Sequence, residues 1–241
     1  MIEAVVSPPA SPAAFFAAPP ATPTALLAAR SGVLADPHNA EKFRAAVAEA
    51  RHANNAVMAA SGSWVAGEYN RALEYVQGDS ELAAFIRGSS YLELSRPQEA
   101  LEALKAHTQT SDPTMAATIL EAFCSNEEWE HLEKNLETAQ LSVADTAYFR
   151  GLLQEIQGDY QGAVAAYSNL LEEYPDHLQA RFRLAYRMDL MGQDEMAIRH
   201  YEQLLVLRPT PSSVLINLGI MYEDRNSFEK ACGCFGAVLR Q

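Results

Sequence analysis

The sequence predicts an all-α protein, a solenoid of helix-turn-helix repeats. The first observation is a 34-residue period in small residues, which recur in two series, with aromatic residues four positions after the second series. The second observation is that turn-forming residues keep the same step. The residues are Gly151, Ala185 and Gly219; Ala163, Ala197 and Ala231; Tyr167, Tyr201 and Phe235; and, at the turns, Gly158, Gly192 and Asn226. Small residues where two helices touch, in units too small to bury their own apolar faces, are typical of tandem helical hairpins.

Residues 1–35 are rich in proline and alanine, and we expect them to form a disordered tail. Six prolines before position 24 exclude any helix longer than a turn or two. The alternative is a docking segment, in which the apolar pairs Phe15-Phe16 or Leu26-Leu27 add to a groove or to the first helix.

Residues 36–80 are expected to form a degenerate or capping helical pair. Asp36-Pro37 has the pattern of a helix cap followed by proline in the first turn. The stretch from there to Ala60 suits one long helix or two short ones. Ser61-Gly62-Ser63 is expected to break it, and the next helix is expected over 64–76.

The repeat pattern begins at 81–112. Gly88 lies 12 residues before Ala100, Leu104 stands at the aromatic position, and Pro97 starts the second helix. The following unit, 113–143, is shortened. It is expected to contain helices over 115–123 and 127–139. Trp129 and Leu132 are expected to replace the small and aromatic residues of the repeat pattern, which are missing here.

Three more repeats complete the array, at 144–177, 178–211 and 212–241. The last is incomplete, because the sequence reaches Gln241 before a proline equivalent to Pro175 or Pro209. Asp176 is expected to cap a helix with Gln179, at capping-box spacing, and Thr210-Pro211 is expected to start the final unit. About ten to twelve helices and no strands are expected in all.

At these residues the chain resembles the tetratricopeptide repeat (TPR) family, and this resemblance implies a right-handed α-solenoid. The bulky residue before the first small position is present as Leu184 and Leu218 but is Arg150 in the first of the three units. We expect Tyr148 and Phe149 to pack there instead.

A narrower resemblance covers roughly 80–241. The segments 182–186 and 215–225 are similar to those of bacterial TPR proteins that continue into a domain like the C-terminal domain of the RNA polymerase α-subunit. That domain is absent from this sequence. The resemblance implies an alternative function, a transcription-associated factor, in a chain expected to stop before its DNA-binding domain.

Charge narrows the classes of partner. The net charge is −13, and it arises entirely from 36–241, since Glu3 and Arg30 cancel within the first 35 residues. An acidic surface disfavours a phosphate backbone, so nucleic acid is an unexpected partner. Three scattered cysteines, no charged secretory start and no apolar run of about 20 residues predict a cytoplasmic protein without a membrane span.

The sequence offers little for catalysis. Cys232 and Cys234 lie two residues apart on an expected helix, so they point to different sides, and they are expected to be small buried or half-buried residues. Cys124 is expected to be a core residue at a helix end. His131 follows a glutamate run but lacks the second histidine four residues away that a metallopeptidase helix needs. No enzyme, metal or cofactor is therefore expected.

What remains is a stripe along the first helix of each of the last three repeats. In the resembled family this stripe lines a concave, peptide-binding surface, and Asn217 is similar to the family asparagines that hold a ligand backbone. The alternative is that its aromatics pack against the next repeat while its carboxylates are solvated. The stripe consists of Tyr148, Leu152, Glu155, Phe182, Tyr186, Asp189, Ile216, Asn217, Ile220, Glu223 and Asp224.

The resulting hypothesis is a protein–protein interaction scaffold with an acidic, aromatic groove. Its partner is expected to be a protein or peptide segment with apolar anchors and basic flanks. The last helix carries Phe228, Phe235 and Leu239 with no capping helix behind it, so self-association through this helix is also expected.

Overall fold

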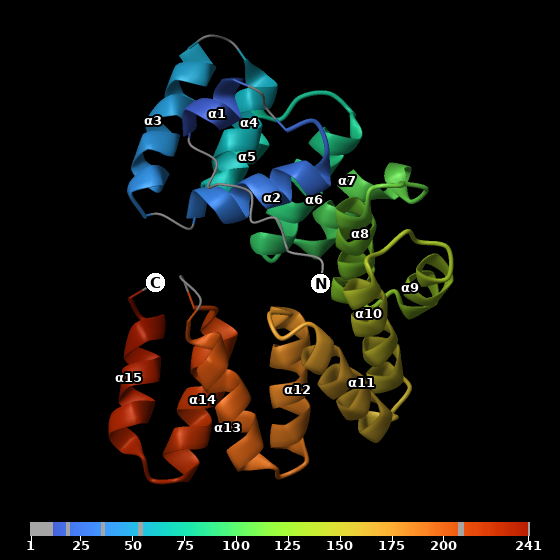
Figure 1. Ribbon diagram of the computed structural model, residues 1–241, viewed down its shortest axis with the longest axis vertical. Coiled ribbons are helices and arrows are strands. Elements are labelled where there is room, and N and C mark those ends of the chain that lie inside the picture. Colours follow the sequence, from blue (N-terminus) through green and yellow to red (C-terminus); the bar gives the residue numbers. More distant parts are fainter. Residues whose placement is uncertain (1–11, 18–19, 35–36, 53–54, 207–209, 241) are drawn as a thin grey trace. The chain divides into compact units, whose positions relative to one another are not determined.

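The computed structural model describes residues 12–17, 20–34, 37–52, 55–206 and 210–240 (Figure 1). This part of the chain forms fifteen α-helices, one short 3₁₀ helix and no strand. The all-α prediction is thus confirmed, although the expected helix number was too low. None of these helices is both long and apolar enough to cross a membrane. The chain divides into two compact units, Met1–Ser142 and Val143–Gln241, called unit 1 and unit 2 below.

Unit 1 contains three helical hairpins preceded by three further helices. The hairpins are α4–α5, α6–α7 and α8–α9. The elements are α1 (Pro12–Ala17), α2 (Pro23–Leu34), α3 (Pro37–His52), α4 (Ala56–Val65), α5 (Tyr69–Tyr75), α6 (Glu81–Glu93), α7 (Pro97–Leu104), η1 (Lys105–His107), α8 (Pro113–Ser125) and α9 (Trp129–Leu136).

The expectation of a disordered tail is wrong for the described residues of 1–35, because α1 and α2 lie there. Phe15 is buried and packs edge-on against Phe43, with 4.8 Å between ring centroids. Leu26 is also fully buried. Phe15 and Leu26 belong to the two apolar pairs named in the alternative, a docking segment, and both are buried. The other residues of the tail, and Asp36 of the expected cap, lie outside the described part of the chain.

The expected break at Ser61-Gly62-Ser63 is also wrong, since α4 runs through it to Val65. A Cβ atom on Gly62 would lie 2.6 Å from Val47 Cγ2 and 3.2 Å from Phe16 Cζ. The glycine is therefore required by packing, and its poor helix propensity is overridden by tertiary contact. The actual turn falls at Gly67, whose φ of +76° favours glycine.

The next two hairpins follow the expected pattern with one exception. Leu104 fills the aromatic position, because a Cβ on Gly88 would lie 2.4 Å from Leu104 Cγ. In the shortened hairpin Leu132 is fully buried and does take the place of a missing marker. Trp129 does not, since its side chain is 36% exposed.

Unit 2 consists of three hairpins, each of two helices. They are α10 (Val143–Ile156) with α11 (Tyr160–Glu173), α12 (Leu178–Leu190) with α13 (Asp194–Leu204), and α14 (Ser212–Asp224) with α15 (Phe228–Val238). The small and aromatic residues of the 34-residue period meet inside each hairpin. A Cβ on Gly151 would lie 2.8 Å from the ring of Tyr167, and one on Gly219 would lie 2.6 Å from that of Phe235.

Local details at the helix starts differ from expectation. His177, and not Asp176, caps α12, because its Nδ1 accepts a hydrogen bond of 3.2 Å from the backbone N–H of Ala180. The N-cap residue of α14 is Pro211, one position after Thr210, and Pro211 provides no side-chain cap. Arg150 stands where the next two repeats have a leucine, and Phe149 was expected to pack there in its place. Phe149 is indeed buried, while Arg150 is exposed.

The expected array over 81–241 is divided at residue 142. Its first two hairpins belong to unit 1 together with α1 to α5, and its last three form unit 2.

Candidate peptide-binding groove

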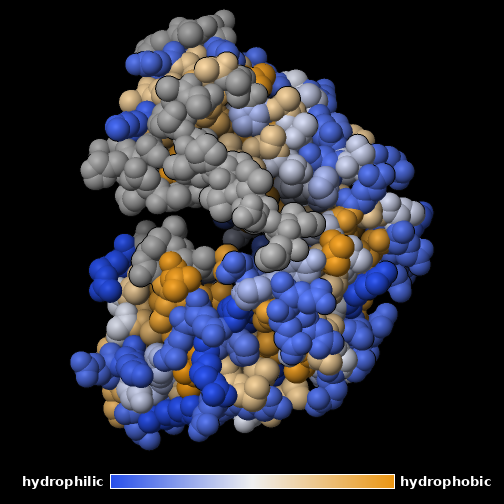
Figure 2. All heavy atoms as spheres, in the orientation of Figure 1, coloured by the Kyte–Doolittle hydropathy of each residue, from blue (hydrophilic) through white to orange (hydrophobic). Residues whose placement is uncertain are grey.

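The predicted stripe lies on α10, α12 and α14, the first helices of the three hairpins of unit 2. Residues four apart on a helix share a face, which places Leu152 one turn after Tyr148 and Ile220 one turn after Ile216. Figure 2 shows one face of this unit, with apolar residues set among hydrophilic ones. The eleven residues fall into three groups by burial and by their contacts with neighbouring repeats.

Two members are buried. Leu152 is 3% exposed and Glu155 is 5% exposed. Neither side chain is accessible to a ligand in this structure. Leu152 and Glu155 are therefore removed from the candidate groove. Leu152 is simply a core residue. Glu155 is a buried acid and requires partners, because an isolated charge in the interior is strongly unfavourable.

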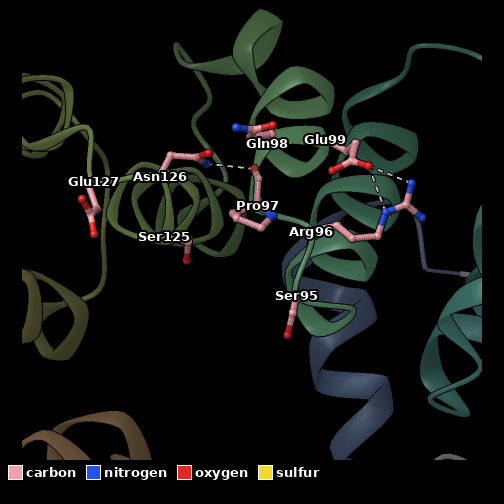
Figure 3. A pocket seen from close by; sticks show the side chains of 8 residues that line it. All are labelled: Ser95, Arg96, Pro97, Gln98, Glu99, Ser125, Asn126 and Glu127. Atoms are coloured by element: carbon pink, nitrogen blue, oxygen red, sulfur yellow. Dashed lines mark hydrogen bonds and ion pairs between the residues drawn. The ribbon is translucent and has the colours of Figure 1, made fainter.

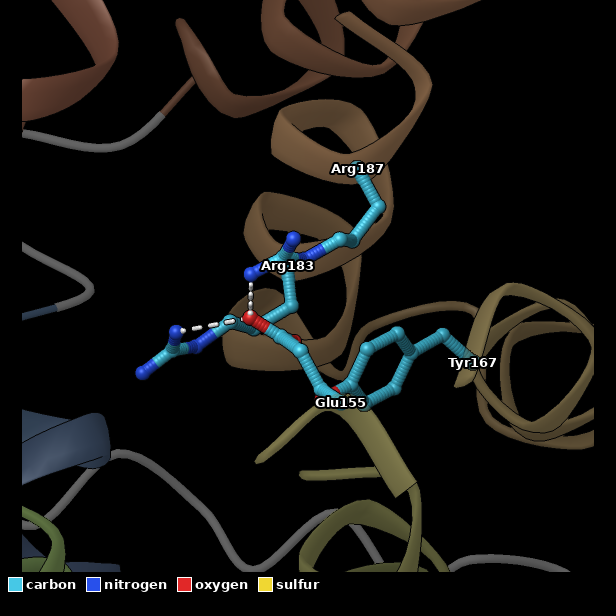
Figure 4. Close-up of polar contacts among 4 residues, drawn as sticks. All are labelled: Glu155, Tyr167, Arg183 and Arg187. Carbon is cyan, nitrogen blue, oxygen red and sulfur yellow. Dashed lines mark hydrogen bonds and ion pairs between the residues drawn. The ribbon is translucent and has the colours of Figure 1, made fainter. Parts of the chain in front are cut away.

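Glu155 obtains its partners from two helices (Figure 4). Tyr167 of α11 donates its hydroxyl to Glu155 Oε2 at 3.0 Å. Arg187 Nη2 of α12 donates to Glu155 Oε1 at 2.5 Å, and Arg183 Nη1 donates to the same oxygen at 3.3 Å. The four residues, called the Glu155 cluster below, join the first repeat of unit 2 to the second.

The surroundings of the cluster are aromatic. The guanidinium of Arg187 lies 4.7 Å from the ring centroid of Tyr160 and 5.5 Å from that of Tyr186. Burial, and then the charge of Glu155, raises the pKa of the Tyr167 hydroxyl, which therefore remains a proton donor. Two arginines face one carboxylate, so Glu155 adds no free negative charge to the stripe.

Three members are half-buried and already in contact with neighbours. The ring of Tyr148 lies tilted against that of His177, with 5.2 Å between centroids, and Phe182 packs edge-on against Tyr201 at 5.8 Å. Asn217 Nδ2 donates to the Tyr201 hydroxyl at 2.9 Å. The amide expected to hold a ligand backbone therefore holds a neighbouring hairpin in this structure. Burial raises the pKa of Tyr201 to about 12.

The remaining six members are half-buried or exposed, and they form the accessible part of the stripe. Ile216 is 40% exposed and Ile220 is 47% exposed, while Tyr186 and Asp189 are half-buried and Glu223 and Asp224 are exposed. Burial, and then the negative charges of Asp194 and Asp224, raises the pKa of Asp189. The carboxylates of α12 and α14 thus influence one another, and this end of the stripe is acidic.

Two hollows lie elsewhere. In unit 1 a polar hollow of about 440 Å³ is lined by the turns of two hairpins (Figure 3). Its polar groups pair with one another, since Arg96 bonds Glu99 and Asn126 Nδ2 donates to the carbonyl of Pro97 at 2.9 Å. In unit 2 a hollow of about 610 Å³ lies over α10 and α11, beside the exposed Val143.

Sequence reasoning missed Arg183 and Arg187. A signal was available, because Arg183 stands one period after the apolar Phe149 and one before Asn217. A charged residue at a position that is apolar in the neighbouring repeat points to a buried partner. That the partner is Glu155 could not be read from spacing.

No group of three or more His, Cys, Asp or Glu side chains is arranged for a metal ion among the described residues. Cys234 is buried and Cys124 is half-buried, whereas Cys232 is exposed, contrary to the expectation for that residue.

Repeated hairpins, each with a small residue against a ring, define a tandem helical repeat protein. Family models described as tetratricopeptide repeat match residues 147–186 and 183–215. Residues 147–215 thus match tetratricopeptide repeats, in agreement with the helical hairpins found there. The narrower resemblance to polymerase-linked TPR proteins stays an expectation.

Two curated relatives match this chain over part of their own length. Photosystem I assembly protein Ycf3 of Prochlorococcus marinus strain MIT 9215 is 32% identical over 108 residues, which are 43% of this chain and 62% of that protein. The same protein of strain MIT 9301 is 33% identical over 100 residues, 40% of this chain and 58% of that protein. The chain thus spans about three fifths of the length of these curated relatives.

Solved structures with related folds include the APC/C hetero-tetramer Cut9-Hcn1. It has a TM-score of 0.68 at 11% identity over 94% of this chain and 48% of that one, a likeness of fold. A structure of MamA, the RS-1 double mutant, matches with a TM-score of 0.43 at 18% identity over 68% of this chain and 94% of that one.

Proposed function

We propose that this chain is a protein-interaction scaffold, and that the accessible stripe of unit 2 binds a protein segment with apolar anchors and flanking Lys or Arg. Tetratricopeptide repeats and a relative named as an assembly protein support the class of function. The nature of the segment is inferred from the side chains of the stripe.

The observation that carries the proposal is an exposed apolar pair beside unpaired acids. Ile216 and Ile220 lie one turn apart on α14 with about half of their surface in water. The acids are Asp189, Glu223 and Asp224, and among the described residues none of them forms an ion pair. Apolar anchors provide most of the affinity of an interface, whereas surrounding charge raises the association rate and selects the partner.

The acidic end of the stripe is also unfavourable to the fold. The pKa of Asp189 is raised by burial and by two neighbouring acids, so its charged form is destabilised in the folded state. Perturbed acids of this kind gather at functional sites more often than elsewhere. A basic segment bound across α12 and α14 would relieve the repulsion.

We place the protein among binding proteins rather than enzymes. A partner of the proposed chemistry is a protein, since an acidic surface disfavours the phosphates of nucleic acids and of anionic lipids alike. No resident cofactor is needed for this function.

The test uses two fluorescein-labelled synthetic peptides with the same leucine-rich centre, flanked either by lysines or by glutamates. Fluorescence anisotropy with the full chain should show saturable binding of the lysine-flanked peptide and weaker binding of the other. Tyr186→Ala should lower the affinity for the lysine-flanked peptide by about 1–3 kcal/mol, the range of an interface anchor. Asp189→Lys should act through the association rate and lose its effect at high salt.

Glu172→Lys serves as the matched control, because Glu172 is an exposed acid on the second helix α11 and undergoes the same change of charge. Thermal melting of each variant separates binding from folding. Equal affinity of the wild type, Tyr186→Ala and Asp189→Lys for the lysine-flanked peptide, with intact folds, would refute the proposed site.

A further inference from the structure

The N-terminal helix α2 lies against the three hairpins of unit 1 without being part of any of them. It contacts α4, α6 and α8, which are the first helices of the three successive hairpins (Figure 1). These helices also contact one another in order, α4 with α6 and α6 with α8. They therefore form one continuous face, called the α4–α6–α8 face below, and α2 occupies it.

The first turn of α2 is held by a single carboxylate. Asp112 Oδ1 accepts a hydrogen bond of 2.9 Å from Thr24 Oγ1, and Asp112 Oδ2 accepts one of 3.1 Å from the Thr24 backbone N–H. Thr24 Oγ1 also lies 2.9 Å from Thr114 Oγ1. Asp112 is the N-cap residue of α8, so one side chain satisfies the starts of two helices.

The far half of α2 is held by an arginine between aromatic rings. The guanidinium of Arg30 lies 4.9 Å from the ring centroid of Trp64 and 5.5 Å from that of Tyr69. Arg30 Nη2 donates to the Tyr69 hydroxyl at 2.6 Å, and Nη1 lies 3.8 Å from Glu93 Oε1. A guanidinium between rings, next to a carboxylate, is a recognition geometry that lysine cannot reproduce.

Between these ends the contact is apolar. Leu26 and Val33 are fully buried and lie on one helix face with Arg30, at spacings of four and three residues. On the other side Leu27 is 43% exposed, and alanines fill much of the remaining sequence. The helix therefore presents a narrow stripe, which is how amphipathic helices bind grooves in other proteins.

We propose that the α4–α6–α8 face is a binding site for a helical protein segment and that α2 is its built-in occupant. The partner that this site fits carries Thr in its first turn, an aliphatic residue two positions later, Arg six positions later and a second aliphatic residue after nine. Complementarity of charge supports this choice, because Asp112 faces the positive end of the bound helix and Glu93 faces the arginine. Such a partner competes with α2 for the same face.

The test separates α2 from the rest of the folded, full-length chain by proteolytic cleavage. A site for a sequence-specific protease is inserted between Leu34 and Pro37, and the purified protein is cleaved. A fluorescein-labelled peptide of residues 20–34 is then added. We expect the cleaved N-terminal fragment to exchange with the peptide, seen as a saturable rise in anisotropy, while unit 1 stays folded by circular dichroism.

Three peptide variants define the recognition. Leu26→Asp should abolish exchange, and Arg30→Ala should weaken binding about tenfold, as loss of one desolvated cation–π contact predicts. Leu27→Ala is the matched control and should bind like the parent, because Leu27 is 43% exposed and is not one of the buried residues of the stripe.

A second measurement uses the uncut chain. In a Trp129→Phe background Trp64 is the sole tryptophan, and its emission reports on the Arg30 site. The Arg30→Ala chain should take up the added parent peptide more readily than the chain with its native arginine. The proposal is overturned if the cleaved fragment never exchanges, if its release unfolds unit 1, or if the parent and Arg30→Ala peptides bind equally.

Discussion

Glu155 shows how one residue can change role between sequence and structure. Its spacing placed it on a ligand-binding stripe, yet it lies at the centre of a buried cluster that joins two repeats. The cluster also explains why the stripe is acidic only toward α14. Arg183 and Arg187 of α12 neutralise Glu155, which is the acid that α10 contributes to the stripe.

The substitution Glu155→Gln should destabilise unit 2 by about 3 kcal/mol, the lower end of the cost of breaking a buried ion pair. The reason is that Arg187 is left without its counter-charge, while Arg183, at 34% exposure, can still reach water. Urea denaturation measures the change. Glu172→Gln on the exposed side of α11 is the control and should change stability by less than about 0.5 kcal/mol.

Replacing both Glu155 and Arg187 by leucine should recover much of that loss, because no charge is then left buried without a partner. Equal stability of Glu155→Gln and the wild type would show that the cluster contributes nothing to the fold.

The raised pKa of Asp189 predicts the direction in which the stability of the fold changes with pH. Because its pKa is raised in the folded state, the folded protein binds more protons than the unfolded protein between the ordinary carboxyl pKa of about 4 and the raised value. Stability should therefore fall as pH rises through this window and rise as pH is lowered. Asp189→Asn should raise the melting temperature at pH 7 and flatten the dependence.

Asp176→Asn is the matched control, since Asp176 is exposed in a turn and undergoes the same substitution. If Asp189→Asn lowers the melting temperature at pH 7, the repulsion inferred from Asp194 and Asp224 does not dominate at this position.

At the scale of elements, we expect the shortened hairpin to open before the hairpins of unit 2. Its second helix, α9, has eight residues, of which only Leu132 is buried, whereas α11 buries three over fourteen residues. Local opening follows burial, so amide hydrogens of α9 should exchange before those of α11 and α13. Exchange measured by mass spectrometry on the full chain tests this. Protection of α9 equal to that of α11 would contradict the assignment.

The elements that sequence predicted well are those fixed by contacts inside one hairpin. Gly151 meets Tyr167 and Gly88 meets Leu104, partners 16 residues away, so a period reveals them. The elements that were missed depend on contacts across many residues. Gly62 remains helical because Phe16 and Val47 pack on it, and α2 is ordered because Asp112 holds it. Proline content and local propensity contain no information about such partners.

At the scale of the molecule, the last hairpin presents apolar surface. In α15 and just after it Phe228 is 58% exposed and Leu239 is 89% exposed, while Phe235 packs against Gly219. We expect this surface to pair with a second copy of the chain, since exposed apolar patches mark association sites.

Sedimentation velocity across a range of concentrations should show association of the wild type, and Phe228→Glu should suppress it. Val143→Glu is the control, because it places the same charge at another exposed apolar residue of unit 2. A wild type that stays a compact monomer, with slow amide exchange through α15, would contradict the prediction.

The candidate site was predictable only in part, because contacts between residues that are far apart in the sequence leave no local pattern. Position along α10, α12 and α14 follows from the period, so the stripe itself could be listed from sequence. Which members face water depends on side chains one repeat away, as Asn217 on Tyr201 and Arg187 on Glu155 show. Six accessible residues remain of the eleven.

The position of Asp112 also affects the order of events during synthesis. Thr24 leaves the ribosome first, but the carboxylate that holds it is 88 residues later in the chain. At typical translation rates of 5–20 residues per second, this separation leaves α2 without its binding face for roughly 4 to 18 seconds. A sequence of prolines and alanines, with few bulky side chains, is suited to that interval, because it offers little apolar surface for aggregation before α8 has been made.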